Sequence, residues 1–136
     1  MKKNIFLAFF LFVFAFVSCA TVRYAAPYSL FGEFSSAPEG VLLNFSLTNN
    51  AQSQIEKICF VLGAYDSDGE PIFEGDSLHI ELKICVLPGE TVDDYFDVDF
   101  LNDFSEDDFE LDYFYAEKIC YSDGSVFEDP LGRFAQ

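Results

Sequence analysis

Apolar and polar residues alternate along several segments of this chain, and this pattern constrains its fold more than any other feature. In residues 41–48 every second side chain is apolar: Val41, Leu43, Phe45 and Leu47. A period of two is typical of a β-strand with one buried face. Residues 78–86 and 92–100 repeat the pattern, whereas no segment sustains the period of 3.6 that an amphipathic helix requires. We therefore expect an all-β domain.

Turn signals separate the expected strands. Residues 55–65 are apolar on both faces, as a central strand would be. Gly or Pro stands between the apolar segments at three places: Asp66-Ser-Asp-Gly69, Leu87-Pro-Gly-Glu90 and Ser122-Asp-Gly124. Such residues favour turns. We also expect a loop at residues 35–40, a return strand that begins at residues 71–74, and a short helical turn capped by Ser105 in the acidic loop of residues 102–110. About seven strands with frequent turns predict a single antiparallel, immunoglobulin-like β-sandwich, which we place over residues 31–136.

The first twenty residues have a different character. Lys2 and Lys3 precede thirteen apolar residues, 5–17, and Ser18-Cys19-Ala20 follow. A cationic head, an apolar run and a small-residue exit form the pattern of a secretory signal. As a helix the run covers about 20 Å, less than the ~30 Å hydrocarbon core, which disfavours a membrane span. We expect residues 1–18 to be a signal-peptide helix that directs export.

The exit from this segment allows two processing routes. Residues Phe16-Val17-Ser18-Cys19 resemble a relaxed bacterial lipobox, with Phe16 where leucine is usual. The resemblance implies lipidation of Cys19, so that acyl chains such as palmitate anchor the chain to a membrane, each buried CH₂ contributing about 0.8 kcal/mol. Residues 19–30 would then be the lipidated cysteine and a short tether. Cleavage after Ala20 is the alternative, because Ser18-Cys19-Ala20 also fits a small-x-small site.

Strand and turn signatures between residues 35 and 128 carry a family resemblance. They are Ile55-Glu-Lys-Ile-Cys-Phe60, Tyr65-Asp-Ser-Asp-Gly69, Leu87-Pro-Gly-Glu90 and Ile119-Cys-Tyr-Ser-Asp-Gly124. The pattern resembles the small β-sandwich domains of bacterial envelope lipoproteins, the FxLYD-like and related domains of unknown function. This resemblance implies an extracytoplasmic, non-enzymatic module that faces the periplasm or the cell surface.

The exported part is strongly acidic. All 24 acidic residues follow residue 18, against five basic ones: Arg23, Lys57, Lys83, Lys118 and Arg133. Such a domain repels nucleic acid and anionic lipid head groups. We therefore expect no nucleic-acid partner. The excess charge is expected to serve solubility, and the alternative partners that it would attract are a basic protein or cations.

The densest acidic run lies between Asp93 and Asp112, with ten carboxylates and no basic residue. We expect Asp93, Tyr95, Asp97 and Asp99 to face outward from the strand at residues 92–100, with Asp97 and Asp99 on its solvated face. Carboxylates along a sheet edge also discourage pairing between edges. A calcium-like cation site is the alternative, since Ca²⁺ takes six to eight oxygen ligands. No known calcium loop has this spacing. The candidate ligands would be Asp93, Asp97, Asp99, Asp107 and Asp108.

Three cysteines share one local context, because Cys59, Cys85 and Cys120 each follow Lys-Ile. With the isoleucines facing the core, the thiols face outward. Single strand cysteines are usually small apolar fillers. A bridge between Cys59 and Cys120 is the alternative, since their strands should be neighbours, and Cys85 should lie on the other sheet. A zinc site would lack a fourth ligand.

The sequence offers little for catalysis. It contains no nucleophile elbow, no phosphate-binding loop and no metalloprotease helix. Its only histidine, His79, is expected on an exposed strand face beside Glu81. We therefore expect no enzyme and no cofactor. The function we expect is that of a membrane-anchored envelope lipoprotein acting as a non-catalytic interaction or structural module, with a cation-binding or thiol-based protein as the alternative.

Overall fold

The computed structural model describes residues 25–38, 40–98 and 108–135. In these ranges the chain forms seven strands: β1 (Tyr28–Ala37), β2 (Gly40–Asn49), β3 (Ile55–Asp66), β4 (Leu78–Val86), β5 (Thr91–Asp97), β6 (Phe109–Tyr121) and β7 (Val126–Glu128). The described residues contain no helix that is long and apolar enough to cross a membrane. The prediction of about seven strands is confirmed. The expected signal helix and Cys19 lie outside the described residues.

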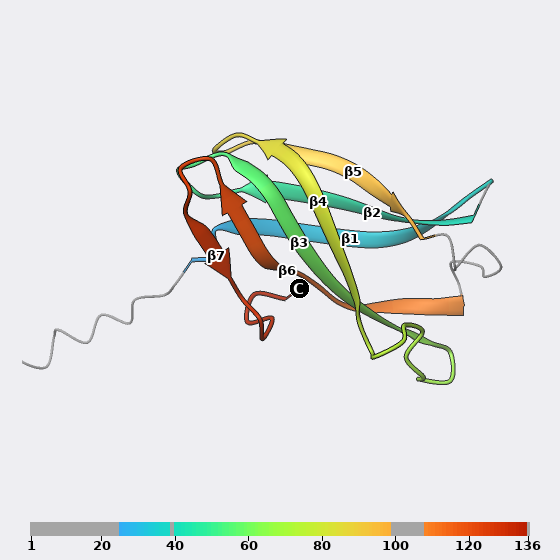
Figure 1. The fold of residues 1–136 in the computed structure, drawn as a ribbon. Helices are drawn as coiled ribbons and strands as arrows, with labels where there is room; N and C mark the ends of the chain where they lie inside the picture. The colour runs from blue at the N-terminus through green and yellow to red at the C-terminus, as the bar shows by residue number, and fades with distance from the viewer. Residues whose placement is uncertain (1–24, 39, 99–107, 136) are drawn as a thin grey trace, which may run out of the picture.

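Two antiparallel sheets lie face to face (Figure 1). Sheet A has the strand order β1-β2-β5, and sheet B has the order β4-β3-β6-β7. The predicted β-sandwich is confirmed. Its fourth strand pairs with β3 in sheet B, whereas in a constant-type immunoglobulin domain the fourth strand belongs to the sheet of the first two. Sheet A is therefore left with three strands and one open outer face.

The core lies between the sheets and is rich in aromatic rings. Phe45 of β2 stacks on Phe96 of β5 with ring centroids 4.8 Å apart. Phe60 of β3 lies 5.3 Å from Phe45 and 5.2 Å from Phe114 of β6, so the rings join both sheets. Gly32 of β1 leaves the space that the Phe114 ring fills, because an added Cβ would lie 2.6 Å from that ring. The residues on the other face of each strand are thereby directed outward.

A buried asparagine ends β2. Asn49 continues the inward-facing series of this strand and is fully buried. Its amide donates to the carbonyl oxygens of Ser53 and Val86, both at 2.9 Å, and its Oδ1 accepts from the Ala51 N–H at 3.0 Å. These bonds tie the β2–β3 loop to the end of β4, and they satisfy a polar group that would otherwise be costly to bury.

The N-terminal boundary of the sandwich differs from the prediction. β1 begins at Tyr28, inside the predicted tether, and runs through residues 35–37, which were expected to form a loop. The ladder with β2 is unbroken from Tyr28, opposite Asn49, to Ala37, opposite Gly40. Tyr28 is only 3% exposed, and its hydroxyl accepts from the backbone N–H of Ala116 at 3.0 Å. Because of this contact between the sheets, the domain begins at Tyr28 and not at residue 31, where the sequence pattern placed its start.

Two further strand predictions are wrong in extent. The expected return strand at residues 71–74 is replaced by an isolated bridge between Tyr65 and Pro71. Proline has no N–H to donate, so it cannot continue a ladder from that side. The strand expected over residues 92–100 spans Thr91–Asp97 in the described part, and residues 99 and 100 lie outside it. The short helical turn considered near Ser105 also lies outside the described residues.

Candidate functional site

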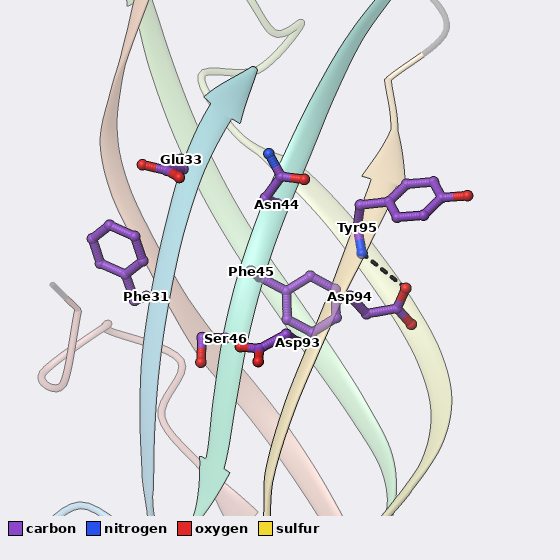
Figure 2. Close-up of a pocket in the computed structure, with 8 residues that line it drawn as sticks. All are labelled: Phe31, Glu33, Asn44, Phe45, Ser46, Asp93, Asp94 and Tyr95. Carbon is purple, nitrogen blue, oxygen red and sulfur yellow. Dashed lines mark hydrogen bonds between the residues drawn. The ribbon is translucent and has the colours of Figure 1, made fainter. Parts of the chain in front are cut away.

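The outward-facing side chains of sheet A surround a shallow depression with a volume of about 370 Å³. Figure 2 shows its lining residues on the three strands of the sheet. We use the term acidic face for the surface made by six of them: Phe31, Glu33, Asn44, Ser46, Asp93 and Tyr95. Phe31 and Tyr95 are 61% and 59% exposed, so two large rings face solvent on the same sheet.

Strand register sets the layout of the acidic face. Ser46 of β2 lies between Phe31 of β1 and Asp93 of β5. In the next row, Asn44 lies between Glu33 of β1 and Tyr95 of β5. Each row therefore has a small polar residue in the middle, with an aromatic ring on one side and a carboxylate on the other. Two strand spacings separate ring and carboxylate, about 10 Å between backbones.

The floor of the depression is held in place by polar contacts. Asn44 donates from its amide to the hydroxyl of Ser35 at 2.6 Å. At the other end of the sheet, the hydroxyls of Thr48 and Thr91 lie 2.7 Å apart. Asn44 and Ser46 lie on the central strand β2, and the rings of Phe31 and Tyr95 lie on the outer strands β1 and β5 (Figure 2).

A second depression continues past Tyr95 toward the β1–β2 hairpin. It has a volume of about 340 Å³ and is lined by Ala37, Pro38, Leu42, Tyr95 and Asp97. Tyr95 lines both depressions. The two together form a groove along β2, with apolar contacts from Leu42 and Pro38 and a further carboxylate from Asp97. On β1 the lining residues of the two depressions extend from Phe31 to Ala37.

In the described part of the chain, the strands of sheet A have only acidic charged residues, whereas sheet B has both acidic and basic ones. β1, β2 and β5 contain four carboxylates, Glu33, Asp93, Asp94 and Asp97, and no lysine, arginine or histidine. The ion pairs of the described part all involve sheet B or the C-terminal segment: Lys57–Glu81, His79–Glu117, Lys118–Glu128 and Arg133–Asp129. The negative charge of sheet A is thus without an internal counter-charge among these residues.

The cysteine predictions have a mixed outcome. Cys59 and Cys120 lie on the neighbouring strands β3 and β6, as expected, and the isoleucines before them are fully buried. Each thiol faces a lysine of the opposite strand, because Cys59 pairs with Lys118 and Cys120 with Lys57. The two cysteines are therefore diagonal neighbours, and they are free thiols in the structure. Their bridging in the exported protein stays a prediction.

The placement of Cys85 on the other sheet is wrong. Cys85 lies on β4, which pairs with β3, so all three cysteines belong to sheet B. The error follows from assuming the constant-type arrangement, in which the fourth strand changes sheet. Burial, with help from the nearby carboxylates of Glu117 and Glu81, raises the pKa of the Cys59 thiol. The thiol form is the weaker nucleophile and metal ligand, which disfavours a thiol-based function at Cys59.

The acidic candidates for a cation site are dispersed. Asp93 and Asp97 are exposed on the outer face of β5, where the sequence placed them. Asp108 is exposed immediately before β6, while Asp99 and Asp107 lie outside the described residues. Within residues 25–38, 40–98 and 108–135, no group of three His, Cys, Asp or Glu side chains is arranged to hold a metal ion. The cation site stays an untested alternative.

His79 is exposed on the same strand face as Glu81, as predicted, and its side chain contacts Ser77 and Glu117. Its Nε2 lies 3.3 Å from Ser77 Oγ, and its Nδ1 lies 3.3 Å from Glu117 Oε2. The order serine, histidine, carboxylate is that of a hydrolase triad. Yet the His79 and Glu117 side chains are 55% and 32% exposed, and catalytic electrostatics need a site that excludes water. We interpret the three residues as a solvated polar cluster.

Sequence reasoning missed the acidic face as a unit. It identified Asp93 and Tyr95 as outward-facing residues of one strand, but it assigned Phe31 and Glu33 to no site. Phe31 and Glu33 lie on a strand whose extent was underestimated, and nothing local shows that this strand lies two positions from β5. A signal was present in the sequence: two large aromatic residues at outward-facing strand positions, in strands without any basic residue.

Comparisons with known proteins bear on the fold alone. No protein-family model matches the chain, and no curated protein matches it significantly. A hypothetical protein from Peptoclostridium difficile 630 has a similar structure, with a TM-score of 0.54, 13% identity, and coverage of 79% of this chain and 88% of that one. A Northeast Structural Genomics Consortium target aligns at a TM-score of 0.34 and 12% identity, over 74% of this chain and 76% of that one. The first likeness supports the all-β fold.

Proposed function

We propose that this chain is an exported bacterial lipoprotein, anchored by a lipid on Cys19, whose β-sandwich acts as a non-catalytic interaction module of the cell envelope. The cationic head, the apolar run and the lipobox-like residues before Cys19 support the anchor. The resemblance of residues 35–128 to FxLYD-like domains of envelope lipoproteins supports the same assignment. The domain would face the periplasm or the cell surface.

One observation carries the interaction role. Phe31 and Tyr95 are largely exposed on one sheet face, on either side of a depression, and the carboxylates of Glu33 and Asp93 accompany them. Exposed rings in contact with a polar surround are typical of protein interaction sites. A structural role alone would not require two large rings to remain in water.

The anchor is tested by mass spectrometry of the N-terminus of the protein isolated from its native membrane. We expect a lipid-modified Cys19 as the first residue. Cys19→Ala should abolish the modification and release the protein from the membrane fraction. An unmodified terminus at Thr21 would instead establish cleavage after Ala20 and overturn the anchor.

The non-catalytic assignment is tested at the polar cluster of Ser77, His79 and Glu117. We expect no labelling by a fluorophosphonate probe and no hydrolysis of p-nitrophenyl acetate above the rate of a Ser77→Ala variant. Labelling that disappears in Ser77→Ala would overturn the assignment.

Calorimetric titration with Ca²⁺ and Zn²⁺ addresses the cation-binding alternative, and we expect neither heat nor a change in melting temperature.

A further inference from the structure

We propose that the acidic face binds a basic segment of a partner protein, with a lysine or arginine side chain lying in the depression between Phe31 and Tyr95. The inference rests on the proposed function and names the class of partner. It depends on the surface of sheet A and not on the lipid, so the two proposals can fail separately.

The first argument is charge complementarity. Four carboxylates lie on β1 and β5 with no cation on any strand of sheet A, whereas the carboxylates of Glu81, Glu117 and Glu128 on sheet B each have a basic partner. Nucleic acid and a second copy of this chain carry the wrong sign for such a surface. A cationic partner would supply the charge that sheet A lacks.

The second argument is the arrangement of rings and carboxylates. A cationic side chain lying over Ser46 and Asn44 would have a ring on one side and a carboxylate on the other in both rows of the acidic face. Cations bind the face of an aromatic ring within about 6 Å of its centroid, with about 0.5–1 kcal/mol at exposed sites. The guanidinium of arginine both stacks on rings and bonds carboxylates, so arginine fits best.

The third argument is the length of the groove. The depression beyond Tyr95 offers Leu42, Pro38 and Asp97 to a residue further along the bound segment. An extended peptide advances about 3.3 Å per residue, so side chains at alternate positions would reach successive rows of the sheet. A free monovalent ion or a single amino acid would leave this second depression unused. A protein segment is therefore the occupant that accounts for both depressions.

The test is titration of the purified full-length protein with an octa-arginine peptide, by calorimetry at low and at moderate salt. We expect binding that weakens as salt is added. Two variants, Phe31→Ala/Tyr95→Ala and Glu33→Gln/Asp93→Asn, should each weaken binding at least tenfold. Tyr95→Phe keeps the ring and should bind within about twofold of the parent. Thermal unfolding of each variant verifies that it is folded.

The matched control removes the same charge elsewhere. Asp68→Asn/Glu74→Gln lies in the exposed β3–β4 loop and should change the affinity less than threefold. If this control and Glu33→Gln/Asp93→Asn lost the same amount of affinity for octa-arginine, the binding would be diffuse electrostatic attraction and the proposal would be overturned. An absence of octa-arginine binding at low salt would also overturn the proposal. A third contradicting result would be that the protein binds a neutral oligosaccharide and that Tyr95→Ala abolishes this binding while octa-arginine binding persists. A Cys19 terminus without lipid would leave these results unaffected.

Discussion

At the scale of single residues, Asn49 shows how a polar side chain occupies a core position. It is fully buried, and its amide and carbonyl groups make three hydrogen bonds to backbone atoms of Ser53, Val86 and Ala51. Asn49→Ala would leave these buried groups without partners, at about 1–3 kcal/mol for each unsatisfied group that water cannot reach. We expect a loss of about 2–4 kcal/mol in the free energy of unfolding, measured by urea denaturation.

Its neighbour provides the control. The Asn50 side chain is exposed and donates to the Ser29 hydroxyl at 2.9 Å, where water can replace the bond. Asn50→Ala should therefore change the free energy of unfolding by about 0.5 kcal/mol or less. Similar losses in both variants would show that the buried network contributes nothing beyond the local turn.

Tyr28 makes stability depend on alkaline pH. Burial raises the pKa of Tyr28 to about 12, an effect larger than the opposing one of the hydrogen bond from Ala116. Because the folded state holds this proton more tightly than the unfolded state, the contribution is complete below the unfolded value of about 10 and is lost as pH rises through about 12. We expect the free energy of unfolding to fall over this window.

Urea denaturation at several pH values measures this dependence. Tyr28→Phe removes the ionisable group, so its alkaline slope should be smaller than that of the parent. The variant also leaves the buried Ala116 N–H without its acceptor, which costs about 1–3 kcal/mol at neutral pH. Identical slopes would assign the alkaline loss to other tyrosines, whose pKa values burial also raises, such as Tyr121.

At the scale of elements, Asp94 protects the open edge of β5. It lies opposite the buried Phe45, at an inward-facing position of the strand, yet it is exposed because β5 is the last strand of sheet A. Its Oδ1 accepts from the Tyr95 N–H at 2.9 Å (Figure 2). An inward-directed charge at an edge strand discourages another chain from pairing there.

We therefore expect Asp94→Val to open this edge to self-association. The variant removes the charge and the acceptor of the Tyr95 N–H, and valine favours strands. Light scattering should show concentration-dependent dimers or larger assemblies, while the parent protein should scatter less at the same concentration. Asp97→Val, on the outer face of the same strand, has the same change in charge and should assemble less. Equal assembly of the two variants would contradict the role of Asp94.

The elements also show where sequence reasoning succeeds. β2 was predicted closely, because its alternation reflects direct contact of one face with the core. The length of β1 was underestimated, because Ser35 and Ser36 do not alternate between apolar and polar. Their pairing with β2 is what makes them strand residues. The sheet that holds β4 could not be read from alternation, since an amphipathic strand fits either sheet. The acidic face was missed for the same reason: it is assembled from β1, β2 and β5 by long-range pairing.

At the scale of the molecule, the carboxylates are concentrated away from the N-terminus. Tyr28 pairs with Asn49, so the chain enters the sandwich at the end where the β2–β3 loop lies. The β1–β2 hairpin and the β3–β4 loop lie at the opposite end (Figure 1). Residues 66–77 at that end carry five carboxylates and no basic residue. On an anchored protein this arrangement would direct the acidic loop of residues 66–77 away from anionic lipid head groups.

The net charge of −17 also predicts how salt acts on stability. Carboxylates repel one another more strongly in the compact state than in the unfolded chain. Raising NaCl from about 0.01 M to about 1 M shortens the Debye length from ~30 Å to ~3 Å. Salt also weakens exposed ion pairs such as Lys57–Glu81, at 3.0 Å, but each such pair is worth only about 0–1 kcal/mol.

Screening of the repulsion should therefore prevail over the loss of the ion pairs. We expect the melting temperature, followed by circular dichroism, to rise by several degrees over this range of NaCl. Removing two carboxylates with Asp68→Asn/Glu74→Gln should raise the melting temperature at low salt and reduce the further gain on adding salt, because less repulsion is left to screen. A melting temperature that falls with added salt would mean that the four ion pairs of sheet B and the C-terminal segment outweigh the carboxylate excess.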